Sequence, residues 1–260
     1  DNGAFYNICT TLTSLDINTS SIPSNAFSGC SKLTALILGN TVTDIEFNAF
    51  NGASALKSFT VPSSVISIGN GAFYGASSIT ELVIPDSVTT LGSYAFYRAS
   101  ALESVILGDG IVNIAGALFY GASRLTSITI PSSVTRIGGS AFSGTGLTSL
   151  VIPDSVETIG NEAFYNTPIT SLTLGKSLNE WITNGNGGNG TFYPICTTLT
   201  SLDINTRVIP NSAFSNCSKL AYLRLGDTVT VIGDNAISGA SPLTSLTIPS
   251  SVTSIGSGAF

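Results

Sequence analysis

The sequence predicts a solenoid built almost entirely from short β-strands, and three observations lead to this prediction. Phenylalanine recurs every 23 residues over a long stretch of the chain. Each interval contains two short apolar runs, rich in β-branched residues, that end at a turn residue. The apolar spacing of an amphipathic helix never persists for a dozen residues, so we expect little helix. A period between 20 and 50 residues is typical of solenoids, in which each coil buries its apolar face against its neighbours.

The repeat extends along the whole chain. The residues that mark successive coils are Phe5, Phe27, Phe50, Phe73, Phe96, Phe119, Phe142, Phe164, Phe192, Phe214, Ile237 and Phe260. We therefore expect a single domain over residues 1–260, made of about eleven stacked coils with these rings inside. Equivalent strands of neighbouring coils should pair in parallel sheets, with rungs roughly 4.8 Å apart.

One coil illustrates the expected elements. A strand over residues 79–84 would turn Leu82 and Ile84 to one face and Val83 to the other. Pro85 should end this strand, because proline has no N–H to donate to a ladder. A second short apolar run follows and ends at the next glycine.

These motifs resemble a known repeat. The order Leu-x-x-Leu-x-Ile-Pro, Ser-Val-x-x-Ile-Gly and Ala-Phe-x-Gly-Cys/Ala-Ser-x-Leu is similar to the 23-residue leucine-rich repeat of the BspA-like surface proteins. The resemblance covers essentially all 260 residues, and the pattern L-x-x-L-x-L fits Leu33, Leu36 and Leu38. It implies a right-handed leucine-rich-repeat solenoid with this strand on the concave face. It also implies adhesion or protein binding at a cell surface.

Composition excludes several functions. Lys and Arg number 9 against 15 acidic residues, for a formal net charge of −6, so the chain lacks the basic surface of a nucleic-acid binder. Its apolar runs are far shorter than the ~20 residues of a membrane span. There is no histidine, no nucleophile elbow and no phosphate-binding loop. We therefore expect a non-enzymatic protein without a cofactor.

The four cysteines occupy one position of the repeat. They are Cys9, Cys30, Cys196 and Cys217, and alanine fills the position in most other coils. One interpretation is a small inward-facing packing site. The alternative is a pair of disulfides, Cys9–Cys30 and Cys196–Cys217, because the rung spacing falls within the ~4.4–6.8 Å range of Cα separations that a disulfide allows.

A longer duplication overlays the short repeat. Residues 5–19 recur almost unchanged as residues 192–206, which indicates one block over 5–191 and a second that begins at 192. An insertion at about 179–191 separates the blocks and contains Trp181, either as part of a binding loop or as a cover for the local core. Both ends of the chain lie within a repeat and neither resembles a polar cap, which suggests continuation or end-to-end stacking.

Tyrosine follows the marker phenylalanine in several coils. We expect Tyr74, Tyr97 and Tyr120 to stack as an exposed ladder on three consecutive coils. Such a ladder could bind a sugar or a protein, because rigid rings offer contact area at little entropic cost. Alternatively, the rings only cover a corner of the coil.

The outward side of the Leu-x-x-Leu-x-Ile strands is a second candidate surface. It is flat, poor in charge and rich in β-branched residues, including Val83 and Ile106, with Glu81 in the neighbouring column. Such a face suits protein binding by shape and aliphatic contact. Asp86 and Asp109 share a turn position on adjacent coils, where a weak Ca²⁺ site or plain solvation would relieve their repulsion.

Together these patterns predict an extracellular or cell-surface adhesion module. Its expected partner is a protein, either a host or extracellular-matrix protein or further copies of the chain end to end, and a carbohydrate is possible. The alternative is a structural segment of a head-to-tail polymerising fibre or surface sheath.

Overall fold

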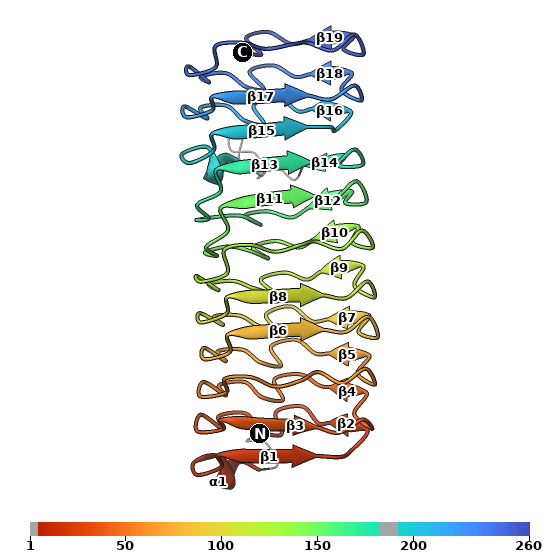
Figure 1. Cartoon of the computed structure of the whole chain (residues 1–260), viewed down its shortest axis with the longest axis vertical. Coiled ribbons are helices and arrows are strands. Elements are labelled where there is room, and N and C mark those ends of the chain that lie inside the picture. Colours follow the sequence, from red (N-terminus) through yellow and green to blue (C-terminus); the bar gives the residue numbers. More distant parts are fainter. Residues whose placement is uncertain (1–4, 182–191) are drawn as a thin grey trace.

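Successive coils of the chain stack along one axis (Figure 1). The structure is a computed structural model that describes residues 5–181 and 192–260. It is a solenoid of about ten turns, with α1 (Tyr6–Cys9) at one end and β19 (Ser254–Ile255) at the other. Among the described residues, α1 and the 3₁₀ turn η1 (Tyr193–Ile195) are the only helical segments, as the sequence predicted.

A four-residue strand lies on one side of most coils. These long strands are β1 (Ser14–Ile17), β3 (Ala35–Leu38), β6 (Glu81–Ile84), β8 (Ser104–Leu107), β11 (Ser149–Ile152), β13 (Ser171–Leu174), β15 (Ser201–Ile204) and β17 (Tyr222–Leu225). Exposed and buried residues alternate along β6, β8 and β11, so one side of each strand faces the core. We call the outward side the long-strand face.

Two-residue strands form a second set on the other side of the coils (Figure 1). They are β2 (Ser21–Ile22), β4 (Asp44–Ile45), β5 (Ser67–Ile68), β7 (Thr90–Leu91), β9 (Asn113–Ile114), β10 (Arg136–Ile137), β12 (Thr158–Ile159), β14 (Glu180–Trp181), β16 (Val208–Ile209), β18 (Val231–Ile232) and β19. They pair in parallel as β2-β4-β5-β7, β9-β10-β12-β14 and β16-β18-β19.

The marker phenylalanines form a continuous stack inside the coils. Ring centroids of neighbours from Phe5 to Phe214 lie 4.9 to 6.1 Å apart, and all these pairs are stacked. The rings from Phe50 to Phe164 are fully buried. The expected placement of Phe50, Phe73, Phe96, Phe119 and Phe142 inside the solenoid is confirmed.

The long-strand sheet is interrupted, although the sequence suggested continuous stacking. Figure 1 shows the long strands in separate groups, which pair as β1-β3, β6-β8 and β11-β13-β15-β17. Residues 58–61, 127–130 and 245–248 occupy the equivalent position in their coils but form no strand. A single isolated bridge, between Ala35 and Ser58, joins the first of these segments to β3.

The residue after each segment explains the interruptions. Where a strand pairs with the preceding coil, the next residue is Gly or Asn. Its N–H donates to the preceding coil at Gly39, Asn205 and Gly226, at 2.8 to 3.0 Å. Every segment that fails to pair with the preceding coil is followed by proline: Pro62, Pro85, Pro131, Pro153 and Pro249. Proline lacks this donor, so the ladder does not close.

The short-strand sheets are interrupted at different levels. Breaks lie between β7 and β9 and between β14 and β16, where the long strands β6–β8 and β13–β15 remain paired. Pro210 follows β16 and lacks a donor. Ala115 follows β9, in the position that Gly92 and Gly138 occupy in their own coils. A Cβ at either glycine would lie only 2.3 or 2.5 Å from the backbone of the preceding coil. The Cβ of Ala115 therefore prevents an equally close approach to β7. Each pair of neighbouring coils is thus joined by at least one ladder.

Candidate binding surfaces

Aliphatic side chains gather in one column of the long-strand face. Val83 and Ile106 are paired across β6 and β8, and they are 55% and 59% exposed. Ile37 and Val151 occupy the same outward position on their strands and are 58% and 62% exposed. Glu81 pairs with a serine in the adjacent column and is also exposed. The structure therefore places these three predicted residues, Glu81, Val83 and Ile106, on one surface.

Tyr74, Tyr97 and Tyr120 form a ladder, as expected. Their ring centroids are 4.6 and 4.7 Å apart, and the ring planes lie within 11° of each other. The rings are half-buried rather than exposed, because each ring covers the face of the next. Stacked rings present mainly their edges and hydroxyl groups to solvent.

A shallow groove runs beside this ladder. Its volume is about 270 Å³, and it is lined by Ser93, Tyr94, Tyr97, Gly116, Ala117, Tyr120, Gly139 and Ser140. The ring of Tyr94 lies 5.8 Å from that of Tyr97 at a tilt of 55°, and the Arg98 guanidinium lies 5.5 Å from the Tyr97 ring centroid. Arg98 and Tyr97 thus make a cation–π contact.

The backbone at two of these residues is unusual. Most described coils have two left-handed positions, two residues before and two residues after the marker residue; residue types vary at the first, whereas the second is glycine or asparagine in every such coil except one. Tyr94 and Arg98 occupy both positions of one coil, with φ of 62° and 58°. Strained backbone of this kind often accompanies functional surfaces. Sequence comparison of the coils could have found this departure, and our sequence analysis missed it.

The predicted site residues do not form one site. Val83, Ile106 and Glu81 do not line the tyrosine groove. Trp181 ends β14, and its backbone pairs with that of Ile159. Its side chain and residues 182–191 of the insertion lie outside the described residues. The proposed role of this loop therefore stays a prediction.

Asp86 and Asp109 have a structural contact. The backbone N–H of Asp109 donates to Oδ1 of Asp86 at 2.9 Å, and Lys176 donates to Asp154 at 3.0 Å in the same way. The carboxylate thus holds the next coil by a hydrogen bond. Within residues 5–181 and 192–260 there is no group of three or more acidic, cysteine or histidine side chains that could hold a metal ion.

The cysteines are joined as neighbours in the stack. Disulfides link Cys9 to Cys30 and Cys196 to Cys217, each with a Cα–Cα distance of 4.1 Å. All four residues are buried. Each bond ties the first two coils of one of the duplicated blocks.

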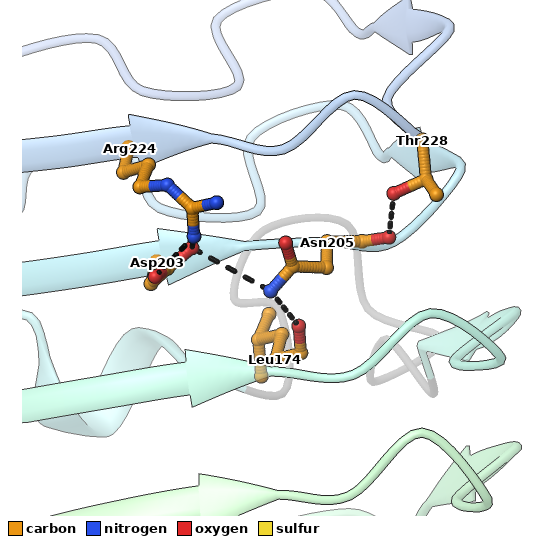
Figure 2. Close-up of polar contacts among 5 residues, drawn as sticks. All are labelled: Leu174, Asp203, Asn205, Arg224 and Thr228. Atoms are coloured by element: carbon orange, nitrogen blue, oxygen red, sulfur yellow. Dashed lines mark hydrogen bonds and ion pairs between the residues drawn. The ribbon is translucent and has the colours of Figure 1, made fainter.

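A charged pair marks the long-strand face of the second block (Figure 2). Nη1 of Arg224 on β17 donates to both carboxylate oxygens of Asp203 on β15, at 2.9 and 2.8 Å. The hydrogen bonds and charge of Asp203 raise the pKa of Arg224. Asn205 continues the network, because its Nδ2 donates to Oδ1 of Asp203 at 3.5 Å and to the Leu174 carbonyl at 3.1 Å. The backbone carbonyl of Asn205 accepts from the Thr228 hydroxyl.

The carboxylate of Glu46 accepts hydrogen bonds from two serines. Oε1 accepts from the Ser21 hydroxyl at 2.8 Å, and Oε2 accepts from the N–H and hydroxyl of Ser24, each at 3.0 Å. The Ser21 hydrogen bond, followed by those of Ser24, lowers the pKa of Glu46 because it favours the charged carboxylate.

Short parallel strands stacked over a phenylalanine core, with leucines at the inward positions, define a leucine-rich-repeat solenoid. The model of the BspA type leucine rich repeat region matches residues 1–123, 66–185 and 186–260, with 6 copies. The chain belongs to this BspA-type leucine-rich-repeat family. No helix within the described residues is long and apolar enough to cross a membrane.

Two solved structures are similar over most of the chain. One is a leucine-rich repeat protein from Bacteroides ovatus, with 26% identity and a TM-score of 0.64, over 99% of this chain and 78% of that one. The other is a leucine rich cell surface protein from Faecalibacterium prausnitzii, with 27% identity and a TM-score of 0.62, over 95% and 78% of the two chains. No curated protein compared with the chain matches it.

Proposed function

We propose that the chain is a non-enzymatic adhesion module that binds protein outside the cell or at its surface. Its repeat class uses extended faces to bind partners. The similar Faecalibacterium prausnitzii chain is described as a cell surface protein. The two disulfides support an oxidising, extracellular location, because such bonds are rare in the cytosol.

The exposed aliphatic column is the main observation behind this proposal. Ile37, Val83, Ile106 and Val151 are each more than half exposed on one face of the strands. Exposed apolar surface of this kind favours association, because contact removes it from water. The neighbouring residues are small and uncharged for the most part, so a flat protein surface can approach closely.

Paired substitutions test the surface. Val83→Asp with Ile106→Asp should weaken binding of the chain to a panel of immobilised extracellular-matrix proteins by at least about tenfold, because charges replace apolar contact area. Val112→Asp is the matched control, since Val112 is 46% exposed but lies outside the long strands. Unchanged binding by the double variant, or equal loss in the control, would reject this surface.

A fibre segment is the second candidate function. The marker rings stack from coil to coil, and Phe5 and Phe260 occupy the marker position in the first and last described coils. If coils of different molecules stack on these rings, the purified 260-residue chain should sediment as a concentration-dependent series of linear oligomers. A single sedimenting species at all concentrations would exclude this function for the chain.

A further inference from the structure

The duplicated blocks differ at two outward positions of one strand. Tyr222 and Arg224 on β17 stand where the first block has Ala35 and Ile37 on β3, at an offset of 187 residues. The register is otherwise the same, because Arg224 pairs with Asp203 as Ile37 pairs with Asp16. The second block therefore carries an aromatic ring and a guanidinium where the first block, in the same register, carries a methyl group and an aliphatic side chain.

These two side chains line a groove. It has a volume of about 260 Å³ and is lined by Ala221, Tyr222, Leu223, Arg224, Leu225, Ser245, Leu246 and Thr247. The groove lies between β17 and residues 245–248, which do not pair with β17 because Pro249 follows them. It is smaller than the roughly 300–1,000 Å³ of sites for drug-sized ligands, which suits a ligand of about one sugar ring.

The groove offers three kinds of contact. Tyr222 is 55% exposed and supplies an aromatic surface for an apolar ligand face. Arg224 supplies guanidinium donors, of which Nη1 alone is engaged, among the described residues, with Asp203 on β15, outside the groove. Ser245 and Thr247 add hydroxyl groups along the opposite wall.

The local charge favours a neutral ligand. Asp203 pairs with Arg224 at 2.8 Å and offsets its charge. The paired guanidinium therefore attracts an anion only weakly. A neutral ligand with adjacent hydroxyl groups on one edge and an apolar face of C–H groups fits all of these contacts, and this is the chemistry of a pyranose ring.

We propose that Tyr222, Arg224, Ser245 and Thr247 form a binding site for a neutral carbohydrate. One pyranose would stack on Tyr222 while two neighbouring hydroxyl groups bond to Arg224 and to a hydroxyl of the facing segment. This site is separate from the aliphatic column of the proposed function, so either can fail without the other. A single-ring contact of this size should have a dissociation constant of about 1 mM.

Nuclear magnetic resonance titration of the full chain tests the site. The probes are the methyl pyranosides of glucose, galactose and mannose. We expect at least one of them to shift the amide signals of residues 222–225 and 244–248. The double variant Tyr222→Ala, Arg224→Ile should raise its dissociation constant by at least about tenfold, because it removes the ring and a charged donor. These replacements occur naturally at positions 35 and 37 of the same fold.

Two further variants separate binding from general effects. Arg124→Ile removes an exposed Arg–carboxylate pair, with Glu103 at 3.3 Å, on a different coil and should leave binding unchanged. Tyr222→Phe keeps the ring and should retain binding within about threefold. The proposal is overturned if no pyranoside shifts these amides, if the double variant binds equally well, or if inorganic phosphate produces the shifts and the sugars do not.

Discussion

The ring of Phe73 stacks on the ring of Phe96 with centroids 5.5 Å apart and planes only 3° from parallel. Both side chains are fully buried, and their backbones are also joined, because the N–H of Phe73 donates to the carbonyl of Ala95 at 2.9 Å. One ring position therefore sets the spacing and the register of two coils.

Truncation of this ring should destabilise the solenoid strongly. Phe96→Ala leaves a cavity between Phe73 and Phe119, and we expect a loss of about 3–5 kcal/mol in the free energy of unfolding. Denaturant unfolding followed by circular dichroism measures it. Phe47→Ala is the control, because Phe47 is 50% exposed and its removal should cost much less. Equal losses would contradict the core role of the stack.

Proline should control strand pairing. In the wild type, the amides of residues 127–130 should exchange with solvent faster than those of β8, because no ladder protects them. Pro131→Gly restores a donor toward β8, so amide exchange over residues 127–130 should slow by about tenfold or more. Hydrogen exchange with mass spectrometry measures this. If the wild-type segment is already as protected as β8, the interruption is absent in solution.

Glu46 should give stability that depends on pH. Its pKa in the folded chain lies below its ordinary value of 4.5, so its contribution is complete above that value and is lost as pH falls through the folded pKa. Wild type should therefore exceed Glu46→Gln in melting temperature near neutral pH, and the difference should disappear in acid. Ser21→Ala should raise the pKa of Glu46, as a carboxyl carbon titration would show. A pH-independent difference would contradict this explanation.

The tyrosine ladder should matter more for binding than for folding. Replacing Tyr74, Tyr97 and Tyr120 together by Ser removes two stacked contacts, each worth about 0.5–1.5 kcal/mol, so the chain should still fold. Binding to the immobilised matrix proteins should weaken. Tyr165→Ser is the matched control, because Tyr165 follows Phe164 in the same position but is exposed. Collapse of the melting transition would show that the ladder is structural.

The sequence could predict what depends on the repeat itself. The marker phenylalanines, the inward leucines and the parallel register all follow from positions that recur in every coil. The Pro-dependent interruptions could also have been predicted, because the missing donor at Pro131 or Pro249 is visible in the sequence. We used the missing proline donor only to predict where a strand ends, and we did not predict the loss of pairing between coils.

The candidate surfaces were predicted less completely, because they depend on contacts between different repeat positions. The column of Val83 and Ile106 followed from strand alternation. The half-burial of Tyr97 did not, because it results from rings above and below and from Arg98. To predict the pairing of Arg224 with Asp203, one must know the register between their two coils, which places residues 21 positions apart opposite each other.

The alternation of broken and intact ladders has a mechanical consequence. A plane drawn between any two neighbouring coils of the described chain cuts hydrogen bonds on at least one side. Two neighbouring coils therefore cannot separate without breaking a strand ladder. A pulling force applied to the two ends would instead be passed from one side of the rod to the other at each interruption. Under the proposed function at a cell surface, fluid flow would apply such tension, and this arrangement favours gradual unfolding from an end over fracture in the middle.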